Sequence, residues 1–186
     1  LALMACGEKQ QAPIDREALV DRNSPQVTAF DSLASLSVGN GEFAFTVDAT
    51  GLQTFPEMYT KGVPLGTQSQ WGRQKEAANW FRVNPHRLHL GMVGFEFGRD
   101  PLAVAQVTDI KQKLNLWEGV INSSFKLDGK PFEVQTACHP KADMVAATIR
   151  SEAHAGVNFR FPYPTGGHCD DACNWTSNDK HSTAIV

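Results

Sequence analysis

The clearest signal of the fold is LSVGNGEFAFTV, residues 36–47. Apolar side chains occupy every second position on both sides of Gly39-Asn40-Gly41, a period typical of strands that bury one face. An Asn-Gly pair accepts positive φ at both central positions of a tight turn. The sequence therefore predicts a β-hairpin with Asn40-Gly41 at its tip.

A second hairpin is predicted over residues 121–138, where apolar positions alternate on both sides of Asp128-Gly129. Gly91 and Gly94 interrupt an alternating run and indicate bulges or a bent strand there. Further strands are expected over residues 86–97, 144–149 and 157–163. Several short strands joined by Gly, Pro and Asn predict an all-β fold, an antiparallel β-sandwich.

Only residues 14–23 have a helix-like pattern, and Pro25 discourages its continuation. Residues 53–84 alternate poorly and are expected to form a long loop, a kind of segment that often carries function. The expected organisation is a signal remnant and tether over 1–13, a short helix and linker over 14–25, the sandwich over 26–165, and a loop with the start of a further segment over 166–186.

The composition is that of an ordinary globular protein, with 41% hydrophobic residues and a net charge of −3 over 186 residues. No run of Lys and Arg interleaved with aromatic residues occurs, so no nucleic-acid partner is expected. No stretch approaches the roughly 20 apolar residues that a membrane span requires. Nothing in the sequence indicates a cofactor.

The first residues resemble a bacterial lipobox, Leu3-Met4-Ala5-Cys6. Cleavage before Cys6 would leave it as the lipidated N-terminus, which predicts a protein held on the bacterial cell envelope by its lipid anchor alone. The alternative is an apolar N-terminus with one buried Cys. The missing initiator Met and the apolar ending at residues 183–186 lead us to expect a fragment of a longer chain.

Three further cysteines follow, and export would permit a disulfide, for which Cys169 and Cys173 are the natural candidates. Cys138 lies in an alternating apolar pattern and is expected to be a small core residue. Around Cys169, His168 and His181 could join in binding zinc, but the spacing matches no standard motif. We therefore expect no metal site, and interpret this segment as a loop or linker.

The best candidates for contact with a ligand are Gln68, Gln70 and Trp71. Indole rings pack against the C–H faces of sugars, and amides exchange hydrogen bonds with hydroxyls, so the three predict a carbohydrate-binding loop. The alternative is a Trp that only packs on the edge of the sandwich. The carboxylates in the most structured regions have no spacing that brings them together, and structural or surface roles are expected for Asp48, Glu57, Glu96 and Glu118.

Several motifs, taken in order, resemble the N-terminal domain of six-hairpin glycosidases, the group of maltose- and trehalose-phosphorylase-like enzymes and glucoamylase-type hydrolases. Residues 36–43 are similar to the opening "sLGNGyxG" motif, and residues 114–121 to an "LDLxxGvv" strand. The turn His139-Pro140-Lys141 occupies the place of a His-Pro-Lys-like turn, and residues 48–57 with 64–72 resemble exported bacterial members. The resemblance covers residues 29–175.

This resemblance implies a galactose-mutarotase-like supersandwich packed on an (α/α)6 barrel that follows residue 186. The acid and base carboxylates of such enzymes lie in the barrel, so no catalytic residue is expected in this chain. The expected role is the sandwich domain of an exported enzyme acting on glycosidic bonds, with carbohydrate and its own barrel as partners. The alternatives are a carbohydrate-binding surface lipoprotein and a purely structural or assembly module.

Overall fold

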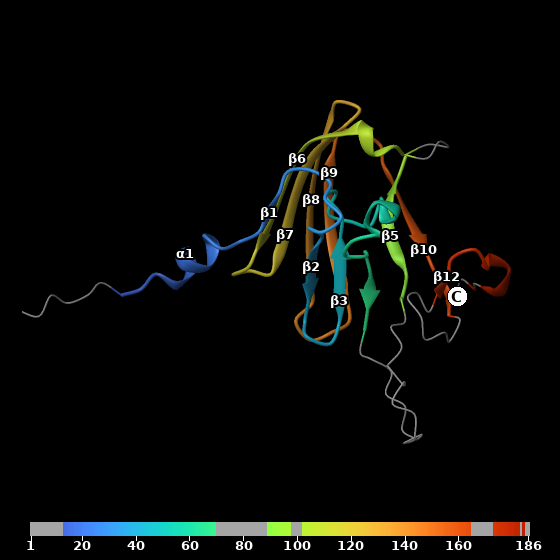
Figure 1. Ribbon diagram of the computed structural model, residues 1–186, viewed down its shortest axis with the longest axis horizontal. Coiled ribbons are helices and arrows are strands. Elements are labelled where there is room, and N and C mark those ends of the chain that lie inside the picture. Colours follow the sequence, from blue (N-terminus) through green and yellow to red (C-terminus); the bar gives the residue numbers. More distant parts are fainter. Residues whose placement is uncertain (1–12, 70–88, 98–101, 165–172, 183, 185–186) are drawn as a thin grey trace, which may run out of the picture.

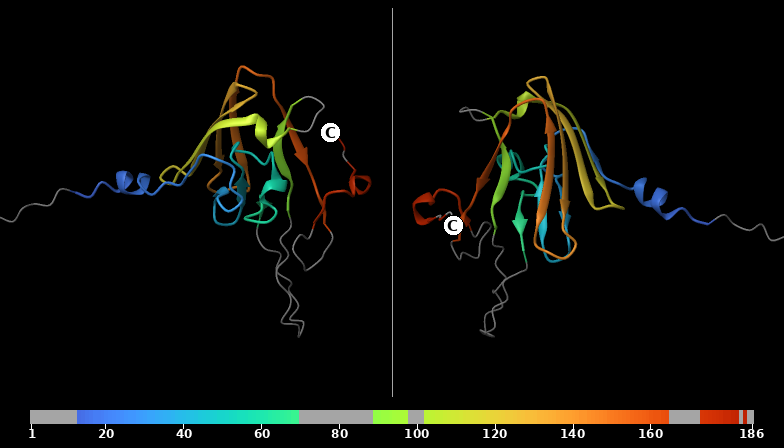
Figure 2. Two further views of the ribbon diagram at one scale, coloured as in Figure 1. Left: turned by 45° about the horizontal axis from the view of Figure 1, so that its top comes forward. Right: turned by 180° about the vertical axis from the view of Figure 1, so that it is seen from behind.

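The computed structural model describes residues 13–69, 89–97, 102–164, 173–182 and 184. The fold is all-β and sandwich-like, with antiparallel sheets and one short α-helix, as predicted (Figures 1 and 2). Within these residues no helix is long and apolar enough to cross a membrane.

One layer is a five-stranded sheet in the order β1-β6-β7-β8-β9. It contains β1 (Gln26–Val27), β6 (Val107–Asn115), β7 (Val120–Leu127), β8 (Lys130–Cys138) and β9 (Val145–Ser151). Facing it are two smaller sheets, β2-β3-β4 and β5-β10. They contain β2 (Leu36–Gly39), β3 (Ala44–Val47), β4 (Thr67–Gln68), β5 (Met92–Glu96) and β10 (Gly156–Arg160). All pairs are antiparallel, as short connections allow.

The first predicted hairpin is confirmed, because β2 pairs with β3 from Leu36↔Val47 to Gly39↔Ala44. Its turn differs from the expected two-residue type. Four residues form the loop and only Gly41 has a positive φ, of 96°. The Asn40 side chain accounts for the difference: its Oδ1 accepts the N–H groups of Glu42 and Phe43 at 3.0 and 2.8 Å, so the amide stabilises a wider loop.

The second hairpin is confirmed with the expected turn, since Asp128 and Gly129 have φ of 47° and 79° between the paired Leu127 and Lys130. Strand β6 was not predicted. A bulge between Thr108 and Lys111, with Asp109 at a φ of 54°, breaks the alternation there. The expected strand over 114–121 is wrong, because residues 116–119 form the turn between β6 and β7.

Of the two alternatives expected around Gly94, a bulge or a bent strand, the bulge is not found. Gly94 lies in regular pairing with Asn158 of β10. A Cβ there would lie 2.8 Å from the carbonyl oxygen of Gln53, so the glycine lets another backbone segment pass close to β5. The predicted strand over 144–149 is found as β9, and that over 157–163 as β10 followed by β11 (Tyr163–Pro164).

Two apolar clusters fill the space between the layers. One gathers the buried side chains around Phe95, Phe125 and Phe132, whose ring centroids lie 5.2–5.9 Å apart. The other gathers the alternating residues of the first hairpin against Ile121, which is fully buried. Burial of apolar area, at about 25 cal/mol per Å², is what holds the layers together.

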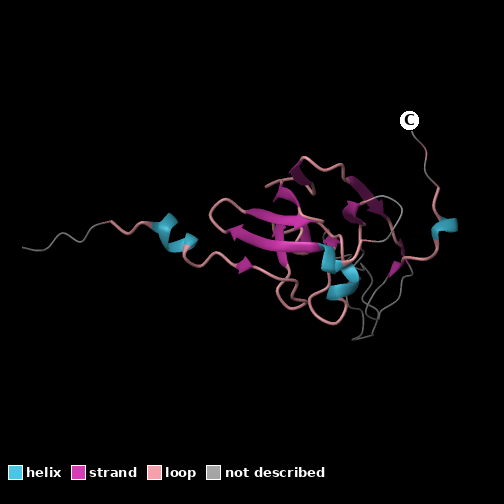
Figure 3. Cartoon of the chain, turned by 90° about the horizontal axis from the view of Figure 1, so that it is seen from above, coloured by secondary structure: helices cyan, strands magenta, loops and turns pink. Residues whose placement is uncertain are grey.

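Outside the sandwich, α1 (Arg16–Asp21) buries no residue and projects away from the sheets (Figure 3), and an ion pair between Asp21 and Lys113 of β6 ties its C-terminal end to them. The Asp15 side chain caps it by accepting the N–H of Ala18 at 3.0 Å. Of the predicted loop 53–84, the described part contains the 3₁₀ helix η1 (Pro56–Tyr59) and β4. The predicted C-terminal loop contains a short strand, β12 (Cys173–Asn174), paired with β11, and a 3₁₀ turn, η3 (Asn178–Lys180).

Candidate functional site

A buried polar cluster joins the two layers between the apolar clusters. At its centre the Asp48 carboxylate accepts the backbone N–H groups of Thr50, Thr54 and Phe55 at 2.7–2.8 Å. The Thr50 hydroxyl also donates to it at 2.5 Å. All four donors come from the loop that Asp48 begins, so this carboxylate fixes the loop.

The same loop is tied to the five-stranded sheet. The Gln112 side chain donates to the backbone carbonyl of Asp48 at 2.8 Å and to the Ser123 hydroxyl at 2.9 Å. The Thr136 hydroxyl donates to the carbonyl of Gly51 at 2.6 Å. Among the described residues no buried side-chain nitrogen or oxygen lacks a partner. A satisfied buried network of this kind specifies one packing of the two layers.

Burial dominates the electrostatics of this cluster. It raises the pKa of Asp48 from 3.8 to about 6, against the opposing effect of the four hydrogen bonds to the carboxylate. Burial and the nearby Asp48 charge together raise the pKa of the Tyr59 hydroxyl. Neither group is open to solvent, so both have structural roles; for Asp48 this is one of the two roles, structural or surface, that the sequence led us to expect.

The structure brings together two of the motifs singled out in the sequence. The Asn40 amide nitrogen lies 3.4 and 3.2 Å from the carbonyl oxygens of His139 and Ala142, to which it donates. The His139 Nδ1 accepts the N–H groups of Lys141 and Ala142 at 3.1 and 3.0 Å. The Gly-Asn-Gly turn and the His-Pro-Lys turn therefore brace each other at one end of the sandwich.

A pocket of about 630 Å³ lies against the face of β3 that carries Ala44 and Thr46, opposite the face that packs into the core. This volume is within the range of small-ligand sites. Side chains of β3, β4, β5 and β10 and of the segments around them line it. Its functional groups belong to Glu57, Gln68, His89, Arg160 and Trp175.

An aromatic pair forms part of the pocket wall. The rings of His89 and Trp175 meet edge to face, with centroids 4.9 Å apart and planes at 85°. The N–H of Gly91 donates to His89 Nδ1 at 3.2 Å, which assigns the ring proton to Nε2, 3.3 Å from the carbonyl oxygen of Leu65. The imidazole is thereby fixed, and it supports the half-buried indole.

A charged pair lies in the same wall. Arg160 Nη1 lies 3.9 Å from Glu57 Oε1, and Arg160 Nη2 is 3.5 Å from the sulfur of Met92. The Arg160 side chain is about half exposed and that of Glu57 is largely exposed, so the ion pair adds little stability. It does provide donors and an acceptor beside an indole ring and the amide of Gln68.

Of the three predicted ligand contacts, Gln68 lies in this pocket. Gln70 and Trp71 lie outside the described residues, and so do Cys6 and Cys169. The hydrogen bond between Ser69 and Asp143 holds the chain just after Gln68. Sequence reasoning missed His89, Arg160 and Trp175; a Trp in the polar segment after Cys173 was the single available signal.

The remaining predicted residues have simpler surroundings. Glu118 accepts a hydrogen bond from the Asn115 amide at 2.8 Å, and Glu96 is exposed. Cys138 packs at the edge of the Ile121 cluster, and Cys173 is half-buried in β12. Within the part of the chain that the structure describes, no three His, Cys, Asp or Glu side chains are grouped to hold a metal ion.

No protein-family model, curated protein or solved structure matches this chain.

Proposed function

We propose that this chain is a carbohydrate-binding β-sandwich, the sandwich domain of an exported protein that acts on glycosidic bonds. The proposal includes a lipid anchor at Cys6 on the bacterial cell envelope and an (α/α)6 barrel as the catalytic partner. In this arrangement the pocket between β3 and β10 holds sugar residues and positions them at one rim of the active site.

The observation that carries the proposal is the chemistry of the pocket wall. An indole ring offers an apolar face to sugar C–H groups, and it lies beside an amide, an imidazole and an Arg–Glu pair. Among the described lining residues Glu57 is the one carboxylate. Because glycoside hydrolysis ordinarily requires two, this wall fits sugar binding, with the reaction assigned to the barrel.

The experiment is a titration of the 186-residue chain with neutral oligosaccharides, followed by isothermal calorimetry. Trp175→Ala is expected to weaken binding about fivefold or more, because it removes an aromatic contact worth about 1–3 kcal/mol. Gln68→Ala is expected to weaken it several-fold through lost hydrogen bonds.

The matched control is Trp117→Ala. Trp117 is 52% exposed in the turn between β6 and β7 and does not line the pocket. Unchanged binding in this control, with loss in Trp175→Ala, supports the proposal. Binding that survives Trp175→Ala, or no binding of any neutral oligosaccharide by the wild-type chain, would contradict it and favour a structural module.

A further inference from the structure

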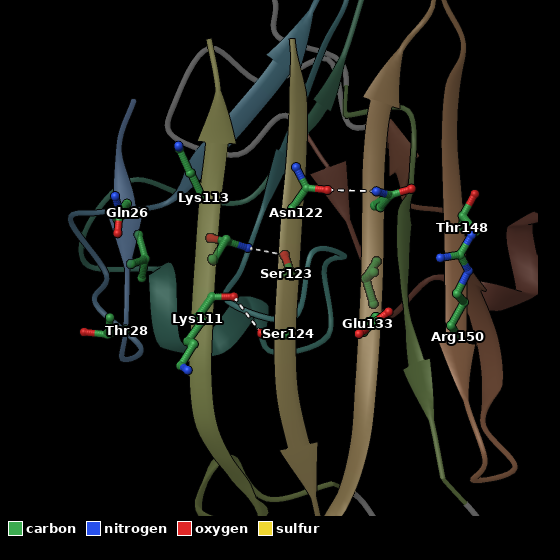
Figure 4. A pocket seen from close by; sticks show the side chains of 14 residues that line it. Gln26, Thr28, Lys111, Lys113, Asn122, Ser123, Ser124, Glu133, Thr148 and Arg150 are labelled. Carbon is green, nitrogen blue, oxygen red and sulfur yellow. Dashed lines mark hydrogen bonds between the residues drawn. The ribbon is translucent and has the colours of Figure 1, made fainter. Parts of the chain in front are cut away.

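The outer face of the five-stranded sheet carries a second polar site, on the opposite side of the sandwich from the pocket with Trp175. A groove of about 520 Å³ runs across the strands β1, β6, β7, β8 and β9 (Figure 4). Its functional side chains stand on the outward face of neighbouring strands, as the pleat requires.

Strand register arranges these side chains in two rows. One row crosses Lys111, Ser124, Glu133 and Arg150, each paired with the next. The second crosses Gln26, Lys113, Asn122, Gln135 and Thr148 in the same way. From β6 to β9 each row spans three strand separations, or about 14 Å, long enough to contact a short oligomer.

The groove is positively charged in a chain whose net charge is −3. Among the described residues that line it, Lys111, Lys113 and Arg150 stand against one carboxylate, that of Glu133. Lys113 forms an ion pair with Asp21, with its Nζ 2.5 Å from the carboxylate. Among the described residues no carboxylate oxygen lies within 4.0 Å of the cationic groups of Lys111 or Arg150. These two cations are placed to meet an anionic ligand.

The uncharged lining consists of amides and hydroxyls. The Gln135 amide donates to Asn122 Oδ1 at 2.9 Å, so the two side chains are held in a fixed ladder across β7 and β8. Such groups match the alternating donors and acceptors of sugar hydroxyls. No aromatic ring is found among the described residues that line the groove, so they offer neither the stacking used by single-stranded nucleic acids nor a platform for neutral sugars.

An acidic peptide fits less well. Strands β7 and β8 are paired along their length on both sides, so over the middle of the groove an extended peptide has no free strand edge to pair with. We propose that this face binds an acidic oligosaccharide, with its carboxylates on Lys111 and Arg150 and its hydroxyls on the Asn122–Gln135 ladder.

The test compares trigalacturonate with its fully methyl-esterified form, which keeps the sugar and removes the charge. We expect the 186-residue chain to bind the acid at least tenfold more tightly than the ester in calorimetry. Affinity for the acid should fall as ionic strength rises from about 0.05 to about 0.5 M. Equal affinity for both forms would overturn the proposal, and so would tighter binding of oligoglutamate.

Three variants locate the site, and two of them have effects of opposite sign. Lys111→Gln should weaken binding of the acid about tenfold, whereas Glu133→Gln should strengthen it several-fold by removing the one repulsive charge. Lys130→Gln, which replaces an exposed cation at the start of β8, is the matched control and should change nothing. A misfolded variant cannot bind more tightly, so loss in both Lys111→Gln and Glu133→Gln contradicts the proposal.

This site does not depend on the proposed function. Trp175→Ala should leave binding of the acid unchanged, and Lys111→Gln should leave binding of neutral oligosaccharides unchanged. The two proposals can therefore fail separately.

Discussion

Two short polar side chains in this protein have structural roles that their type alone would not assign to them. The Asp48 carboxylate has no ion-pair partner among the described residues, and it accepts hydrogen bonds from four donors of its own loop. Asn40 shapes one turn with its oxygen and braces another with its nitrogen. Both side chains accept hydrogen bonds from backbone N–H groups of loop residues, which stabilises these loops without regular backbone pairing.

The raised pKa of Asp48 predicts a pH dependence of stability. Since the folded pKa of about 6 lies above the unfolded value of 3.8, the contribution of Asp48 is fully present below pH 3.8 and is lost as the pH rises through about 6. The loss is about 3 kcal/mol. Urea unfolding at several pH values, compared with Asp48→Asn, measures it.

The comparison of the wild type with Asp48→Asn has one expected outcome and one that contradicts it. The amide introduced by Asp48→Asn cannot ionise, so the stability difference between the two proteins should move against the wild type as the pH rises from about 4 to about 7. If it instead moves in favour of the wild type, the four hydrogen bonds outweigh burial and the carboxylate is ionised in the folded protein throughout that range.

At the level of strands and loops, two glycines, Gly41 and Gly51, lie in loops at positions with a positive φ. Gly51 has a φ of 83°, and a Cβ there would lie 2.8 Å from Ser123 Oγ and 3.0 Å from Val134 Cγ1. Gly41 has a φ of 96°, and a Cβ there would have no atom within 4 Å. A side chain at either position would strain the backbone, but only one at Gly51 would also overlap with neighbouring atoms.

Replacing each glycine with alanine should show this separation. Gly41→Ala is expected to lower the free energy of unfolding by about 1 kcal/mol, from the left-handed backbone alone. Gly51→Ala should lower it by about 3 kcal/mol or more, because it also forces apart the loop and the sheet. Chemical denaturation of both variants measures the difference. Equal losses would mean that the loop can move away from Ser123 at no cost.

The part of the molecule that the structure describes presents three kinds of surface. One face carries the pocket with Trp175, and the opposite face carries the charged groove. The third is apolar: Phe159 in β10 and Phe161 just after it are 62% and 61% exposed. Among the described residues β10 pairs with β5 alone, so its other edge has no strand beside it. An apolar edge strand of this kind favours self-association.

Charges at these two positions are expected to reduce that association. The double substitution Phe159→Lys and Phe161→Lys should shift the chain toward monomer in sedimentation velocity at high concentration. Leu33→Lys, which replaces a lone apolar residue that is 73% exposed, is the control and should have no effect. A wild-type chain that stays monomeric at high concentration would contradict the prediction.

Local sequence was sufficient to predict the all-β class, both hairpins and the short helix, because these depend on contacts between residues close along the chain. It also singled out Gln68, which lies in the pocket with Trp175 and whose contact with a ligand stays a prediction. Strand β6 was not predicted because a bulge interrupts its alternation of apolar and polar residues. The close backbone contact at Gly94 was not predicted because Gln53, which makes it, is far away in sequence. That His89, Arg160 and Trp175 meet at Gln68, and that Lys111 and Arg150 share one face, emerged only from the folded chain. Such sites are assembled by sheet register and layer packing, which join residues that no local pattern connects.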